Sequence, residues 1–78
     1  MTLVPRQIRM AMAAIDITVE ALAQETKLRP ETISRLRTGD SPGRAATHMK
    51  LIKVFRARGV QFSMRGDIAC VCAPINDE

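Results

Sequence analysis

Apolar side chains recur at helical spacing along most of this chain of 78 residues, and at strand spacing near its end. Up to about residue 58 they stand three or four positions apart, as on one face of a helix. This spacing predicts helices at about 5–15, 18–26, 30–38 and 46–58. The period then falls to two, which predicts a β-hairpin with strands 60–63 and 68–72. We expect residues 73–78 to form a frayed tail.

The residues at the ends of these segments support the same division. Pro5 and Pro30 suit the first position of a helix, where no backbone N–H is needed. Thr18 is a good N-cap, and Gly39 can take the left-handed conformation that ends a helix. Gly66 and Asp67 would form the hairpin bend. The chain is therefore expected to be one mainly α domain, from 1 to 78, with a C-terminal hairpin.

The second and third expected helices form a distinctive pair. Their apolar positions would lock one helix against the other across a short polar connection, in which Leu28 plugs the corner. These positions are Val19, Leu22, Ala23, Leu28, Ile33 and Leu36. Such spacing is typical of a helix-turn-helix, whose second helix can lie in the major groove of DNA.

Charge is concentrated in the middle of the chain. Residues 27–58 hold nine basic and two acidic side chains, a net charge of +7, whereas the whole chain carries +4. A basic block beside a helix-turn-helix pattern favours a phosphate-bearing partner, although a solvated surface explains most excesses of this kind.

The chain lacks the sequence signals of membrane and secreted proteins. No apolar run is long enough to span a bilayer, and the N-terminus lacks the pattern of a secretory signal. Cys70 and Cys72 are the only cysteines. Two positions apart on a strand they are poorly placed for a mutual disulfide, so we expect reduced thiols and a cytoplasmic location.

The chain resembles the Cro/repressor-type (XRE-type) family of helix-turn-helix transcription regulators. The resemblance rests on Leu22-Ala23, Leu28, Thr32-Ile33-Ser34-Arg35-Leu36 and Gly39, and covers about Ile8 to Phe62. It implies a four-helix domain that binds double-stranded DNA, with the helix from Pro30 to Thr38 as the recognition helix. It also implies transcription regulation, as a repressor or as an activator.

The resemblance assigns DNA-binding roles to residues of this chain. Arg35 is the strongest candidate for a base contact, since its planar fork can bond two acceptors of guanine; the alternative is an ordinary surface arginine. Glu31 can accept a hydrogen bond from cytosine, and Thr32 or Ser34 can contact a base or a phosphate. The side chains expected to serve the DNA backbone are Lys27, Arg29, Arg37 and Arg44.

Several positions depart from the family pattern. Val19 stands where members have a phosphate-binding Gln, and Lys27 where the turn commonly carries Gly. Pro30 and Glu31 begin the recognition helix, although Pro can donate no hydrogen bond and a carboxylate repels phosphate. Members often pair an Arg of the first helix with a Glu late in the third. Here those positions are Met12 and Arg37, so no such ion pair is expected.

These departures keep a second hypothesis open. A regulator with the same fold and no DNA-reading face would act by binding protein, for example as an antiactivator that sequesters another transcription factor. Met10, Met64 and the hairpin edge would then offer an adaptable contact. A role in a phage or mobile element fits either hypothesis, and the residues do not distinguish these roles.

Self-association is a further open question. The hairpin has unpaired edges, so residues 60–72 would form a two-fold contact between copies, or would fold back on the helices of their own chain.

Catalytic or metal chemistry is not expected. His48, the only histidine, is expected at the surface or as a helix cap, and no residue has the spacing of a catalytic triad. Cys70 and Cys72 fall short of the four ligands of a structural zinc site. We therefore expect no catalytic residues, no metal and no cofactor.

Overall fold

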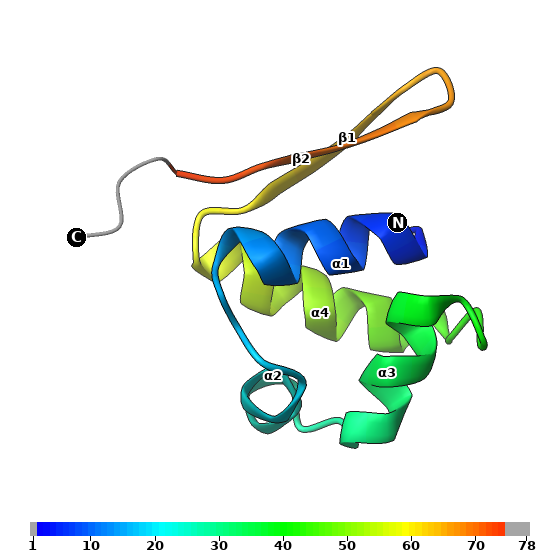
Figure 1. Cartoon of the computed structure of the whole chain (residues 1–78), viewed down its shortest axis with the longest axis vertical. Helices are drawn as coiled ribbons and strands as arrows, with labels where there is room; N and C mark the ends of the chain where they lie inside the picture. Colours follow the sequence, from blue (N-terminus) through cyan, green and yellow to red (C-terminus); the bar gives the residue numbers. More distant parts are fainter. Residues whose placement is uncertain (1, 75–78) are drawn as a thin grey trace.

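The structure, a computed structural model that describes residues 2–74, contains four helices followed by an antiparallel hairpin (Figure 1). The elements are α1 (Pro5–Ala14), α2 (Val19–Thr26), α3 (Pro30–Thr38), α4 (Ala45–Ala57), β1 (Gln61–Arg65) and β2 (Ile68–Cys72). The prediction of a mainly helical chain with a C-terminal hairpin is confirmed. The helix ends lie within one residue of the expected ones, which is the usual uncertainty of a helix boundary.

The residues expected to begin and end the helices do so in the structure. Pro5 and Pro30 occupy the first positions of α1 and α3. The Thr18 hydroxyl accepts a hydrogen bond of 3.1 Å from the backbone N–H of Ala21, so it caps α2. Gly39 follows α3 with a φ of 86°, in the left-handed region that residues with a Cβ avoid.

The hairpin is longer in its first strand than the sequence suggested. Met64 and Arg65 belong to β1, and Val60 is a fully buried residue before it. Arg65 pairs with Ile68, so the bend contains only Gly66 and Asp67, as predicted. A two-residue loop requires positive φ in its first residue or in both, and Gly66 supplies a φ of 63°. The expected first strand, 60–63, was therefore wrong at both ends: it begins one residue later and ends two residues later.

One core joins all four helices. Its buried apolar side chains are Leu3, Ile8, Ala11, Met12, Leu22, Ala23, Ile33, Leu36, Leu51, Ile52, Phe55 and Val60. Leu28 and Val19 pack against its edge, as the helix-pair pattern predicted. Leu3 was not expected there. The N-terminal segment lies beside the loop that precedes α4, where Leu3 lines a hollow together with Pro42, Gly43 and His48.

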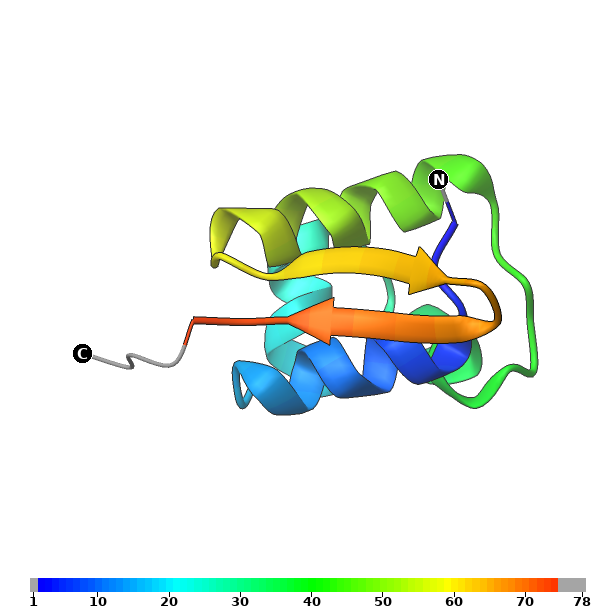
Figure 2. The ribbon, with the colours of Figure 1, turned by 90° about the horizontal axis from the view of Figure 1, so that it is seen from above.

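The hairpin lies over α1 and α4, on the opposite side of these helices from α2 and α3 (Figures 1 and 2). Phe62 meets Phe55 of α4 edge to face, with ring centroids 5.7 Å apart. From α1, the buried Gln7 side chain donates to the carbonyl oxygens of Ser63 and Cys70, at 3.3 and 3.4 Å. The inner face of the hairpin thus folds back on the helices of its own chain.

His48 is buried, not a surface side chain, so that expectation was wrong. Its Nδ1 accepts a 3.0 Å hydrogen bond from the backbone N–H of Leu3, which leaves Nε2 to donate to the Pro42 carbonyl at 2.7 Å. The imidazole therefore fastens both the N-terminal segment and the loop before α4. Its place follows from helical spacing, since His48 shares the buried face of α4 with Leu51 and Phe55.

The expected frayed tail is also corrected in part. Ala73 is half-buried against the core. Residues 75–78 of that prediction lie outside the described residues. No helix among the described residues has the length and apolar character needed to cross a membrane.

Candidate nucleic-acid interface

The α3 helix has a polar face directed away from the core. Ile33 and Leu36 anchor its inner side in the core, with exposures of 0% and 2%. Its outer side carries exposed Glu31, Ser34 and Arg35. The C-terminal hairpin does not cover this face, because it packs across α1 and α4 at the other end of the molecule (Figure 1).

The chain enters α3 through a tight three-residue connection. Lys27 ends α2 with φ 59° and ψ 33°, a left-handed conformation that costs a residue with a Cβ about 1 kcal/mol. Leu28 then turns inward, and Arg29 precedes the helix in an extended conformation. As a result, the exposed Lys27 and Arg29 side chains flank the N-terminal end of α3.

Glu31 and Arg35 lie one helical turn apart on the outer side of α3, a spacing that brings side chains together. Within residues 2–74 they form no ion pair, so the guanidinium is available to a ligand. The Thr38 hydroxyl is directed back into the helix, where it donates to the Ser34 carbonyl at 3.0 Å. The outer side of α3 therefore offers one cationic fork, one carboxylate and the Ser34 hydroxyl.

Two further predicted side chains lie at the flanks of this face. Thr32 and Arg37 are half-buried rather than exposed. The backbone carbonyl of Arg37 accepts a hydrogen bond from the Arg9 guanidinium of α1. Met12, the other position of the expected missing ion pair, is buried in the core at 6% exposure.

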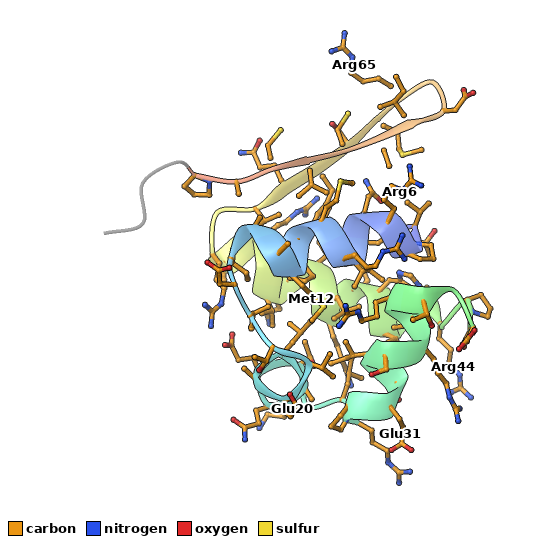
Figure 3. All side chains as sticks on the ribbon, viewed as in Figure 1. Arg6, Met12, Glu20, Glu31, Arg44 and Arg65 are labelled. Atoms are coloured by element: carbon orange, nitrogen blue, oxygen red, sulfur yellow. The ribbon has the colours of Figure 1, made fainter. Side chains whose placement is uncertain are left out.

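Arg44 stands apart from the other candidate residues. It is the exposed N-cap of α4, beyond the loop that follows α3. In Figure 3 its side chain extends away from the helices, as that of Glu31 does at the end of α3 farthest from the hairpin. The structure thus collects Glu31, Ser34 and Arg35 on one helix face, places Lys27 and Arg29 before it, and leaves Arg44 across the loop.

A second basic surface lies on α4. Lys50, Lys53 and Arg56 are exposed along the outer side of this helix and make no ion pairs among the described residues. They belong to the basic block 27–58 of the sequence and were not predicted as candidate binding residues. Their spacing of three residues puts them on one side of α4, beside the exposed Met49.

The remaining chemistry of the described residues is sparse. Cys70 is half-buried and Cys72 is exposed, both as free thiols. Between residues 2 and 74, no three His, Cys, Asp or Glu side chains come close enough to hold a metal ion.

Comparison of the chain with protein-family models, with curated proteins and with solved structures found no match.

Proposed function

We propose that this protein is a sequence-specific DNA-binding transcription regulator of the Cro/repressor type. In this proposal α2 and α3 form a helix-turn-helix, and α3 lies in the major groove. The observation that carries the proposal is the uncovered polar outer face of α3, whose inner face is locked in the core by Ile33 and Leu36. Such anchoring supports base reading because a recognition helix must hold its side chains in a fixed register.

The candidate residues divide into two roles. Arg35 would read guanine through two hydrogen bonds, and Ser34 or Thr32 would contact a neighbouring base or phosphate. The cations at the margins of α3 would hold the DNA backbone, and they are Lys27, Arg29, Arg37 and Arg44. Backbone contacts fix orientation, whereas base contacts supply specificity.

Lys27 adds an independent reason for this assignment. A glycine would adopt its left-handed conformation without strain, yet this position carries a cation. Strained residues of this kind cluster at functional sites. A phosphate contact at the entrance to α3 gives the cation at this backbone position a function in the proposal.

A titration with DNA tests the proposal. Duplexes selected on the protein from a random library are compared with scrambled duplexes by fluorescence anisotropy. We expect the selected duplexes to bind at least ~100-fold more tightly. Four phosphate-neutralising cations would give a slope of about −3.6 when log K is plotted against log salt concentration. Equal binding of both duplexes, at micromolar affinity or weaker, would reject specific regulation.

Dimer formation belongs to the same proposal. Two copies would read half-sites about one helical turn apart. The outer hairpin face carries Ile68, 65% exposed, and is the surface that we assign to the contact between copies. Sedimentation of the protein and of Ile68→Glu tests this step, and a wild-type monomer at high micromolar concentration would contradict it.

The protein-binding hypothesis is supported by a separate observation. Met49, Met64 and Ile68 are each more than half exposed on so small a chain, as is typical of adaptable protein contacts. Under this hypothesis, affinity capture from the source cell recovers a transcription activator and retains no DNA.

A further inference from the structure

A shallow groove follows the outer side of α4. It has a volume of about 400 Å³ and is lined by Met49, Lys50, Ile52, Lys53 and Arg56. Met49 is 52% exposed, and the buried Ile52 side chain forms part of the floor. The groove therefore combines an apolar floor with a cationic rim, and none of its residues belongs to the α3 face.

This groove continues toward the hairpin. A second depression, of about 450 Å³, is lined by Arg56, Gly59, Val60, Gln61 and Phe62. Arg56 lines both, so the two hollows adjoin each other at the end of α4. Seen from above in Figure 2, β1 runs beside α4 while β2 runs beside α1, which puts the free edge of β1 on the side of the groove.

The free edge of β1 carries unpaired backbone groups. The sheet has only two strands, so β1 pairs with β2 and with no other element among the described residues. Because Arg65 and Ile68 close a two-residue loop, the ladder hydrogen bonds fall at positions 61, 63 and 65. The N–H and C=O groups of Phe62 and Met64 then point outward. They make no other hydrogen bond within residues 2–74.

The electrostatics of this surface favours a negatively charged occupant. From Arg44 to Arg65 the sequence contains six basic residues and no acidic one. The single ion pair of the described residues uses Arg58 with Glu25, which leaves Lys50, Lys53 and Arg56 without an acidic partner. A second copy of the chain fits poorly, because a two-fold pairing of β1 edges would bring the same three cations of both copies together.

We propose that this surface binds an extended acidic segment of a partner protein. The segment adds to β1 as a third strand, hydrogen-bonded to Phe62 and Met64. Its apolar side chains cover Met49 and the groove floor, and its carboxylates meet the cations of α4. Such a strand covers the apolar floor, pairs with the free edge of β1 and neutralises the cations. A nucleic-acid backbone would do only the last of these. This surface is separate from α3, so the proposal does not depend on DNA reading.

Titration with a synthetic peptide tests the proposed binding of an acidic strand. A nine-residue peptide of alternating Glu and Val, blocked at both ends, is added to the ¹⁵N-labelled full chain. We expect saturable shifts of the Phe62 and Met64 amides and of the α4 amides, and no binding of the peptide with Lys in place of Glu. Shifts confined to α3, or equal binding of both peptides, would overturn the proposal.

Two variants with the same change of charge sharpen the test. Lys53→Glu is expected to weaken peptide binding at least tenfold, because it reverses a charge at the rim. Arg6→Glu, on α1 at the other side of the hairpin, should change it by less than twofold (Figures 2 and 3). Both side chains are exposed, so unchanged circular dichroism serves as the folding control. Equal affinities for the two variants would contradict the proposal.

Two competing occupants give distinct results. If DNA is the occupant, a random duplex shifts the amides of β1 and α4 while the Glu-Val peptide leaves them unchanged. If a second copy is the occupant, the amides of α4 shift together with those of β1 as the protein concentration rises, whereas a contact between copies through Ile68 leaves the α4 amides unchanged. Either result would overturn the proposal. Neither bears on Arg35, whose role is judged from the discrimination between selected and scrambled duplexes.

Discussion

The outer faces of α3 and α4 differ in chemistry although both helices bury their inner faces in one core. The α3 face presents a guanidinium, a carboxylate and a hydroxyl, whereas the α4 face presents three cations around Met49. Hydrogen-bonding groups of mixed type can distinguish bases, but cations alone attract any polyanion. Positive charge alone is therefore a poor guide to a base-reading surface. Lys50, Lys53 and Arg56 of α4 form no ion pair among the described residues, whereas α3 carries hydrogen-bonding groups of mixed type.

The loop between these helices fixes how the two faces are related. Gly43 lies in this loop with a φ of 74°, against Leu36 of α3 and the buried His48 of α4. His48 in turn holds the loop through the Pro42 carbonyl. Close packing of this kind means that the faces are set by a few buried atoms that bind no ligand.

The largest expected effect on stability comes from disrupting the packing of Gly43 between α3 and α4. In Gly43→Ala the new Cβ would overlap Leu36 Cδ2 and lie 3.1 Å from His48 Nε2, at a backbone angle that alanine resists. We expect a loss of about 3 kcal/mol in the free energy of unfolding, measured by urea denaturation. The proposed DNA binding at α3 and the proposed peptide binding at α4 should be lost together.

Gly66→Ala is the matched control for this substitution. Gly66 also has positive φ, but no atom lies within 4 Å of the position of its Cβ. The expected loss is about 1 kcal/mol. Equal destabilisation by the two substitutions would show that the close approach at Gly43 is unimportant.

The next effect separates the two faces. Arg35→Ala removes the bidentate group of α3 and is expected to lower discrimination between selected and scrambled duplexes by about 10–100-fold, or ~1–3 kcal/mol. Lys53→Ala should leave that ratio unchanged, since it lies on α4. Anisotropy titrations of both variants with selected and scrambled duplexes measure this discrimination. The comparison fails if both variants alter discrimination by the same factor.

Lys27→Gly should change stability and DNA affinity in opposite directions. Glycine relieves the left-handed strain at a φ of 59°, and the free energy of unfolding should rise by about 0.5–1 kcal/mol. Loss of the cation should lower the affinity for any duplex several-fold and make the salt slope shallower by about 0.9. Thermal denaturation and salt titration follow the two effects. A variant with lower stability and unchanged DNA affinity would contradict this prediction.

Glu31→Gln is expected to act in favour of DNA binding. The substitution removes a negative charge from the outer face of α3 and keeps the shape of the side chain. At low salt the affinity for scrambled duplex should rise by about two- to fivefold, and the gain should fall as salt screens the charge. A reduced affinity for the selected duplexes alone would mean that the carboxylate itself reads a base.

The smallest effect concerns the ion pair between α2 and the C-terminal end of α4. Arg58 and Glu25 form it with side chains that are 43% and 37% exposed. Because water competes at this exposure, Glu25→Gln should cost no more than about 0.5 kcal/mol in urea denaturation. Binding at either face should be unchanged. A cost above 2 kcal/mol would indicate that this pair helps to set the relation of the two faces.

Much of the fold followed from local sequence signals. Pro5, Thr18, Pro30 and Gly39 act through their own backbone and nearest neighbours, so their roles could be predicted and are confirmed. Helical spacing also gave the correct inner residues of α2 and α3. The extent of β1 was missed because Met64 and Arg65 have no strong strand signal of their own, and pairing with β2 decides their state.

The candidate site divides in the same way. The resemblance named Glu31, Ser34 and Arg35 as candidate DNA contacts, and all three side chains are exposed on α3. The half-burial of Thr32 and Arg37 depends on neighbouring elements, so it was not foreseen. The roles of these residues in DNA binding stay predictions.

The sequence by itself determined where the helices begin and end, where the hairpin bends and which side of each helix is apolar, because these depend on contacts within a few residues. Only the tertiary structure decided that Leu3 and His48 join in one buried hydrogen bond, 45 positions apart in the chain. It also decided that the hairpin covers α1 and α4 and leaves α3 uncovered. Such outcomes depend on which apolar surfaces meet when the whole chain packs, and no local pattern contains that information.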